Sequence, residues 1–360
     1  MNETRPQTSD LSSRKTQHLD ICLDTTRRVE TDRTRFDQVH LVHRSIPAID
    51  TETIDPSGHL LGLPIAQPFF ISSMTGGSTA GYETNKILAE VAQELGIAVG
   101  MGSVRILLRK PEVIEHFMLK RRAPNVPVFA NIGAVQLGTE SDRIVDLIDR
   151  LEVDGVAVHL NPAQELFQSD GDRDFSGVRD AIAAFVETSP VPVIVKETGM
   201  GIDPGTVAEL FALGARYVNI AGSGGTNWVR VESYRDDAAA ASAPLFDSWG
   251  IPTALALAAL GRTRRGVLAS GGIRNGLEVA KAIALGAEAV GLALPFVRAV
   301  KQDGVAGGVA LGRRIAHELW LAMALSGSAT LGALRGARLW LDGELEHDAA
   351  ALTAATEEPM

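Results

Sequence analysis

The chain has one cysteine, no long apolar run and few aromatic residues, and each shortage excludes a class of protein. Because Cys22 stands alone, an intrachain disulfide framework is excluded. No stretch has the apolar length of a membrane-spanning helix, and the polar N-terminal residues lack the core of a signal peptide. These absences predict a cytoplasmic protein with no membrane partner.

The sequence also lacks the motifs of a zinc site and of a serine hydrolase, and the basic charge expected of a nucleic-acid-binding protein. No pair of histidines has His-x-x-x-His spacing, so a zinc site is not expected, and no G-x-S-x-G elbow indicates a serine hydrolase. The formal charge of -10 and the isoelectric point near 5.3 argue against a nucleic-acid partner. A local basic pocket for phosphate remains compatible with this charge.

What the sequence does contain is a repeated alternation of short apolar runs and amphipathic stretches. With 36 glycines and 5% aromatic residues, the composition favours an α/β protein with tight turns. The amphipathic stretches include 83–95, 142–151, 203–213 and 277–285, and a helix is also expected over 252–260. The apolar runs cover residues 69–74, 97–101, 128–132, 156–160, 193–196, 217–221, 267–270 and 289–294.

Eight such runs predict a (β/α)₈ barrel, with an open doubly wound sheet as the competing fold. Polar or glycine-rich motifs follow nearly every run, whereas a doubly wound sheet would concentrate them at one switch point. We expect an N-terminal extension over 1–64 that acts as a lid on the substrate, a barrel over 65–305, and C-terminal helices with an acidic tail over 306–360. The extension shows no sustained period, and the tail is expected to fray.

The last two barrel motifs indicate a phosphate site. ASGGIRNG at 269–276 and GLALP at 291–295 follow the seventh and eighth runs, where backbone N–H groups of such barrels bind phosphate. Gly271 and Gly272 allow close approach of the backbone, and Arg274 can add charge. SGGIR alone could instead be a plain strand-to-helix turn.

Four polar residues, Ser103, Asn131, Lys196 and Thr226, follow other runs and would meet at one mouth of a closed barrel. Together they suit a planar heteroaromatic ring with hydrogen-bonding edges. Lys196 could stabilise negative charge on a reduced flavin. The alternative is a salt bridge in the barrel interior with Glu197 or another carboxylate.

HLNPAQE at 159–165 and RKTQH at 14–18 concentrate further polar groups. Glu165 suits magnesium, which takes one or two protein carboxylates and fills its other positions with water and phosphate oxygens. Glu165 could also simply stabilise the first turn of a helix that starts at Pro162. RKTQH fits a lid over an anionic substrate, although an isolated basic cluster is usually a solvated tail.

Several motifs follow one another in a specific order: SSMTGG, GMGSVR, NIGAVQL, HLNPAQELFQSDGDRDF, VIVKETG, GSGGTNWVRVE and SGGIRNG. This series resembles the type 2, flavin-dependent isopentenyl-diphosphate isomerase family over nearly the whole chain. The resemblance implies a 1,3-allylic proton shift that interconverts isopentenyl and dimethylallyl diphosphate, for isoprenoid biosynthesis. It also implies reduced FMN as acid and base, magnesium to hold the diphosphate, NADPH to reduce the flavin, and a homo-oligomer, either a tetramer or an octamer.

The same resemblance implies roles for individual residues. Magnesium would bind Glu165, and the catalytic residues would be Gln164, which faces the hydrocarbon, with His159 and Lys196. The substrate would contact Arg14, Lys15, His18, Ser103, Arg105, His159, Asn161 and Gln164. FMN would contact Ser73, Met74, Thr75, Ser103, Asn131, Lys196, Thr226, Gly271, Gly272, Ile273, Arg274, Ala293 and Leu294.

Two positions depart from the family pattern, and two other functions compete. Asn219 stands where Asp is expected, and Asn227 where Ser is common. One competing function is an FMN oxidoreductase of the hydroxyacid oxidase type, which would need a histidine base after a later strand. The other is a barrel that binds flavin or phosphate without catalysis.

Overall fold

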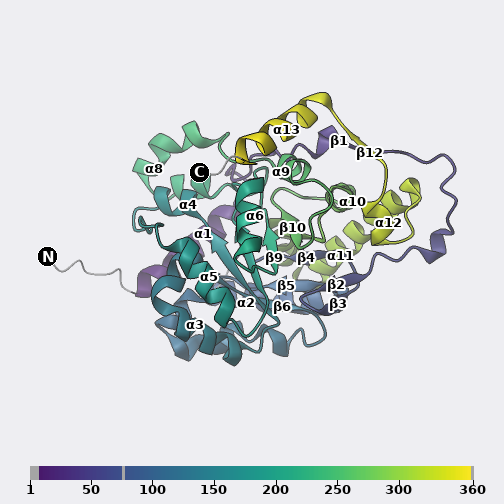
Figure 1. The fold of residues 1–360 in the computed structure, drawn as a ribbon. Helices are drawn as coiled ribbons and strands as arrows, with labels where there is room; N and C mark the ends of the chain where they lie inside the picture. The colour runs from purple at the N-terminus through teal and green to yellow at the C-terminus, as the bar shows by residue number, and fades with distance from the viewer. Residues whose placement is uncertain (1–7, 75–77, 358–360) are drawn as a thin grey trace.

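The computed structural model describes residues 8–74 and 78–357, and its centre is a closed barrel of parallel strands (Figure 1). The last barrel strand hydrogen-bonds to the first, with Val290 opposite Phe69, so this sheet has no open edge. The (β/α)₈ barrel is therefore confirmed, and the doubly wound alternative is wrong. In barrel order the strands are β4 (Phe69–Ile71), β5 (Ala98–Gly100), β6 (Val128–Gly133), β7 (Gly155–Leu160), β8 (Val193–Glu197), β9 (Tyr217–Asn219), β10 (Val267–Ser270) and β11 (Ala289–Leu292).

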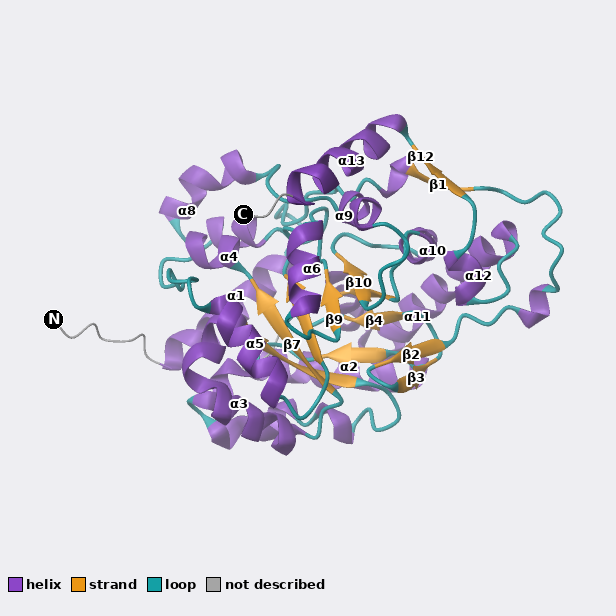
Figure 2. Cartoon of the chain, viewed as in Figure 1, coloured by secondary structure: helices purple, strands orange, loops and turns teal. Residues whose placement is uncertain are grey.

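Helices surround the strands (Figure 2) and begin where the sequence provides capping groups. Ser78 and Asn275 accept hydrogen bonds from backbone N–H groups of the first turns that follow them, and Asp203 caps a helix that has Pro204 at its first position. After β5, short 3₁₀ helices over 104–121 replace an α-helix. The covering helices are α2 (Thr79–Leu95), α3 (Leu137–Leu151), α5 (Val178–Thr188), α6 (Pro204–Ala212), α9 (Thr253–Leu260), α10 (Gly276–Ala284) and α11 (Leu294–Ser326).

The end of the barrel where the strands begin is closed by a hairpin of β2 (Gly58–Leu60) and β3 (Leu63–Ile65). Leu60, Leu61 and Ile65 pack in one cluster with barrel-interior side chains such as Phe70 and Phe129. The cluster is buried, so the hydrophobic effect holds the hairpin in place. Because this end is filled with side chains, polar groups at the opposite strand ends face the accessible mouth.

The N-terminal extension is more ordered than the sequence predicted. Its first element is α1 (Thr8–Leu23), which contacts α2 and α7 (Trp228–Ser233). Ile21 and Cys22 are buried against Leu294 of α11 and Val231 of α7. The sequence shows no sustained period here because α1 has a weak apolar period of its own, and tertiary packing supplies most helix stability.

The C-terminal region also differs from the expectation. The acidic tail forms α13 (Gly343–Glu357), which packs on α9 and α6 instead of fraying, and Leu345 is fully buried. Before it, β12 (Leu339–Leu341) pairs with β1 (Val39–Leu41) of the N-terminal extension, and α12 (Leu331–Arg335) contacts α10. These contacts attach both chain ends to the barrel.

Two further helices, α4 (Pro162–Phe167) and α8 (Asp237–Ser242), lie in loops that follow β7 and β9. Both contact α7, which in turn contacts α1. Across residues 8–74 and 78–357, no helix has the length and apolar composition needed to cross a membrane.

Candidate active site

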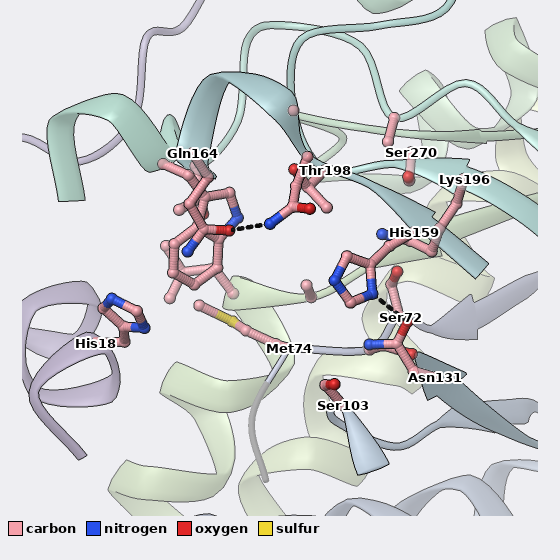
Figure 3. A pocket seen from close by; sticks show the side chains of 18 of the residues that line it. His18, Ser72, Met74, Ser103, Asn131, His159, Gln164, Lys196, Thr198 and Ser270 are labelled. Carbon is pink, nitrogen blue, oxygen red and sulfur yellow. Dashed lines mark hydrogen bonds between the residues drawn. The ribbon is translucent and has the colours of Figure 1, made fainter. Parts of the chain in front are cut away.

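A pocket opens at the carboxyl ends of the barrel strands and is bounded on one side by α1 (Figure 3). It brings together residues predicted from distant motifs. Two predicted residues are not found in the lining. Thr75 lies outside the described residues. Ile273 does not line the pocket because the side chain of Ile273 packs in the hydrophobic core. The lining includes Arg14, Lys15, His18, Ser73, Met74, Ser103, Arg105, Asn131, His159, Asn161, Gln164, Glu165, Lys196, Thr226, Gly271, Gly272, Arg274, Ala293 and Leu294.

One end of the pocket is a glycine-rich cradle after β10. Gly271 and Gly272 have φ angles of +98° and +76°, which side chains rarely adopt. Thr253 Oγ1 donates a hydrogen bond of 2.6 Å to Gly271 O and fixes the turn. Beside the turn, α11 begins at Leu294, and no side chain caps its N-terminus. Uncapped backbone N–H groups at this helix end are typical of an anion site.

The middle of the pocket holds His159 and Lys196 on neighbouring strands. His159 Nδ1 lies 3.1 Å from Asn131 Oδ1. Figure 3 marks this contact with a dashed line. Burial, then the nearby cations Lys196, Lys15 and Arg105, lower the pKa of His159 to about 3. Its imidazole is therefore neutral at physiological pH and can serve as a hydrogen-bonding group but not as a resting cation.

Lys196 is 6% exposed, and its Nζ donates to the backbone oxygen of Glu197 at 2.8 Å. The carboxylate of Glu197 instead accepts hydrogen bonds from the N–H groups of Thr198, Gly199 and Met200. Among the described residues Lys196 forms no direct salt bridge. Burial lowers the pKa of Lys196, and the negative charge of Glu197 partly offsets this effect. An interior pair with Glu197 therefore remains the competing interpretation.

The other end of the pocket is cationic and is formed partly by α1. Lys15 Nζ donates to Ser103 O at 2.9 Å, and Arg14 and Arg105 line the same wall. Burial, followed by repulsion from Arg14 and Arg105, lowers the pKa of Lys15 to about 7. The basic cluster is thus part of a pocket wall, and the interpretation of it as a solvated tail is wrong.

Glu165 lies beside this cationic wall at the start of α4. The residue is 8% exposed, and its carboxylate accepts hydrogen bonds from Asn161 Nδ2 at 2.9 Å and Asp172 N at 2.8 Å. Gln164 donates to Glu232 Oε1 at 3.1 Å, and His18 Nε2 lies 2.8 Å from the same oxygen. Glu165 is therefore held in place, and Glu232 connects Gln164 to α1.

Comparisons with known proteins agree with this architecture. The FMN-dependent dehydrogenase family matches residues 8–115 and 159–341. A lactate oxidase of Pediococcus acidilactici has a TM-score of 0.67 at 15% identity, over 94% of this chain and 96% of that one. A flavocytochrome b2 variant has a TM-score of 0.65 at 19% identity, over 94% and 86% of the two chains. These structures support the barrel fold alone.

The sequence relatives identify the family more specifically than the solved structures do. Isopentenyl-diphosphate delta-isomerases of Halobacterium salinarum and Borreliella afzelii are 42% and 41% identical to this chain. The first match covers 95% of this chain and 96% of the relative, and the second covers 92% and 94%. The chain belongs to the isopentenyl-diphosphate delta-isomerase family. As a member of an isomerase family with a flavin-enzyme barrel, it is an isomerase and a flavoprotein.

The pocket of this family member fits FMN. Ser73 Oγ is buried in the wall, and within the described residues it has no hydrogen-bond partner. A buried hydroxyl normally has one, so the unpaired group indicates a ligand at this position. The glycine-rich cradle suits a phosphate, and Lys196 suits the negative edge of a reduced flavin ring.

Ser73→Ala is expected to weaken FMN binding by about 3- to 10-fold, the contribution of one hydrogen bond. The flavin-free protein should keep its stability, because no hydrogen bond to the described residues is lost. Fluorescence titration of FMN and thermal unfolding of the flavin-free protein measure the two quantities. Ser189→Ala, which removes a hydrogen bond to Val191 O distant from the pocket, should instead lower stability and leave FMN affinity unchanged. Equal FMN affinity in Ser73→Ala would contradict a flavin contact at Ser73.

The donor set at Glu165 fits magnesium bound through substrate. In the described part of the chain, no group of three or more His, Cys, Asp or Glu side chains could hold a metal by itself. Magnesium commonly binds one protein carboxylate together with phosphate oxygens and water. Glu165 can supply that carboxylate, whereas an all-protein cage would need more ligands.

Sequence reasoning missed several residues of the site. Ser72, Gln136, Thr198 and Trp228 also line the pocket, and Glu232 supports it from behind. The usable signal for Glu232 was its place one helical turn after Trp228 in the motif GSGGTNWVRVE.

The two departures from the family pattern have structural roles. Asn219 is buried, and its Oδ1 accepts a hydrogen bond from Ser270 Oγ at 2.8 Å. Asn227 caps α7 by accepting from Val229 N at 2.9 Å. A neutral amide at position 219, next to Lys196 in the strand register, leaves the lysine charge uncompensated from that side.

Proposed function

We propose that this protein interconverts isopentenyl diphosphate and dimethylallyl diphosphate with bound reduced FMN and magnesium. One observation carries the proposal: the cationic wall with Glu165, which follows β7, and the flavin-type cradle, which follows the non-adjacent strand β10, line a single pocket. A diphosphate at the cationic end would place a five-carbon chain toward the centre. Reduced FMN, when bound, supplies a group that can add one proton to the alkene and accept another.

The protein residues then bind and orient the substrate. Arg14, Lys15 and Arg105 would neutralise the diphosphate, with hydrogen bonds from His18, Ser103, His159 and Asn161. Glu165 would hold magnesium against the phosphate oxygens. Fixing the charged end orients an unreactive hydrocarbon, so these contacts act by positioning.

The hydrocarbon end requires a wall that excludes water. Trp228, Met74 and Leu294 line the pocket and provide apolar surface. The amide of Gln164 lies among them and is anchored by Glu232 and Asn161. We assign Gln164 to contact the reacting carbons and Lys196 to stabilise charge on the reduced flavin.

Three wider expectations belong to the same proposal. NADPH would reduce the flavin before turnover without being consumed in each cycle, since the reaction has no net redox change. The protein would act in the cytoplasm and assemble as a homo-oligomer, a tetramer or an octamer.

Diphosphate affinity is expected to fall as the pH rises above about 7, because Lys15 loses its proton there. An anionic ligand favours the protonated lysine, so binding below pH 7 gains the full charge and binding above it must take up a proton. Calorimetry with magnesium pyrophosphate at pH 6.5 and 8.5 measures the effect. The wild type should lose up to about tenfold more affinity over this interval than Lys15→Arg, which stays charged. Parallel profiles would exclude Lys15 as the titrating group.

The proposed activity is tested by incubating the protein with isopentenyl diphosphate, FMN, magnesium and NADPH, and by omitting each component in turn. Dimethylallyl diphosphate should form only when reduced flavin and magnesium are present, without stoichiometric NADPH oxidation. Oxidation of a 2-hydroxy acid without isomerisation would favour the FMN oxidoreductase. Bound FMN without either reaction would favour a barrel that binds flavin but does not catalyse.

A further inference from the structure

Two carboxylates of one loop are paired with cations of the proposed diphosphate end. Asp170 Oδ2 lies 2.8 Å from Arg14 Nη1, and Asp172 Oδ2 lies 3.5 Å from Arg105 Nη1. Gln136, another lining residue, also donates to Asp172 Oδ2 at 3.3 Å. Both aspartates belong to the loop over 168–177, which connects α4 to α5. The chain therefore places negative charge directly against groups that should bind an anion.

This loop is fixed against α4. Arg173 donates through Nη1 to Glu165 O and through Nη2 to Gln168 O at 2.7 Å. A Cβ atom at Gly171 would lie 2.0 Å from Glu165 O, so the backbone can pass here only as glycine. Because Asp172 N also donates to the Glu165 carboxylate, the loop and the proposed magnesium ligand form one unit. The aspartates do not line the pocket themselves, but the fixed loop holds them against Arg14 and Arg105, which do.

Carboxylates offset most of the local positive charge. Four cations, Arg14, Lys15, Arg105 and Arg173, lie with three carboxylates, Glu165, Asp170 and Asp172. A metal-free diphosphate ester carries about three negative charges near neutral pH, and its magnesium complex carries about one. Carboxylates near the binding site repel the first form much more strongly than the second.

We infer that Asp170 and Asp172 make the pocket selective for the magnesium complex of a diphosphate over the free diphosphate. The inference rests on the proposed function and specifies the form in which the substrate is bound. The arginines alone would attract any polyanion. With the two aspartates in place, the anion must bring a metal ion to offset the added negative charge, and Glu165 is positioned to bind that ion.

The test uses inorganic pyrophosphate as the probe and the FMN-loaded protein. Calorimetry with excess magnesium, and again with EDTA in place of the metal, gives two dissociation constants for each variant. In Asp170→Asn/Asp172→Asn, metal-free pyrophosphate should bind at least about tenfold tighter than in the wild type. Affinity for the magnesium complex should change less than about threefold, so the preference for magnesium falls.

Two controls separate local charge from other effects. Asp146→Asn/Asp180→Asn makes the same change in net charge at exposed helix positions, where the carboxylate side chains are 72% and 87% exposed. It should leave the preference for magnesium unchanged because exposed charges are screened. If the double variant folds poorly, the single variant Asp170→Asn replaces it, because it preserves the Asp172 contacts. Its preference for magnesium should lie between those of the wild type and the double variant.

The outcomes distinguish the inference from the proposed function. An unchanged preference for magnesium in both aspartate variants, or equal loss of both affinities, would overturn the inference and leave the aspartates as supports for the arginines. In either case isomerase activity of the wild type would still support the proposed function. If magnesium pyrophosphate fails to bind the wild type and no isomerisation occurs, the proposed function fails together with the inference.

Discussion

Glu165→Gln is expected to lower kcat/KM for isopentenyl diphosphate by about 10²- to 10³-fold, because the variant loses the carboxylate proposed to hold magnesium. The neutral side chain keeps nearly the same shape and can still accept one of the hydrogen bonds from Asn161 and Asp172. FMN affinity should be unchanged, since the cradle lies at the other end of the pocket. Activity measured against magnesium concentration provides the test.

A matched control for this variant is Glu115→Gln, which removes an exposed carboxylate paired with Arg121. It should retain wild-type activity and the wild-type response to magnesium. The assignment of the metal to Glu165 would be wrong if Glu165→Gln kept full turnover at the wild-type magnesium concentration. A loss of activity together with loss of FMN would instead indicate a disrupted pocket.

Gly271→Ala is expected to remove FMN binding, with at least about a 100-fold loss of affinity, and to destabilise the fold by several kcal/mol. The residue has a φ of +98°, and a Cβ atom would lie 2.0 Å from Gly222 O. That oxygen belongs to the backbone, so relief requires movement of the loop after β9. Such movement would disturb both sides of the proposed phosphate cradle.

The comparison variant is Gly138→Ala in α3, where a Cβ atom would have no neighbour within 4 Å. Alanine in a helix is favoured over glycine by about 0.5–1 kcal/mol, so this variant should be as stable as the wild type or slightly more stable. Thermal unfolding and fluorescence titration of FMN measure both variants. Wild-type FMN affinity in Gly271→Ala would show that the cradle does not bind the flavin.

The barrel strands were the most predictable part of the molecule. Each is a short run of buried side chains followed by glycine or polar residues, and this local pattern does not depend on distant contacts. Strand ends shifted slightly, as at β4, which ends at Ile71 instead of Met74, because barrel hydrogen bonds and not hydropathy set the boundary. The predicted mouth residues therefore met in one pocket, although their proposed roles await the experiments above.

The two ends of the chain were less predictable. Neither α1 nor α13 has a strong apolar stripe, so each depends on surfaces that other segments provide. The strand β1 finds its partner β12 about 300 residues away, and no local signal specifies such a pairing. Glu232 had a local signal in its place after Trp228, but its contacts with His18 and Gln164, which are distant in sequence, became visible only in the fold.

The sequence by itself determined the barrel, the family and the chemical character of each strand-end motif. These properties follow from local hydropathy, glycine placement and side-chain type. Only the tertiary structure decided that α1 closes one wall of the pocket, that Lys196 Nζ donates to the backbone oxygen of Glu197, and that Asp170 and Asp172 pair with the arginines. Such pairings depend on the distances between side chains remote in sequence, and those distances are set by the folded backbone.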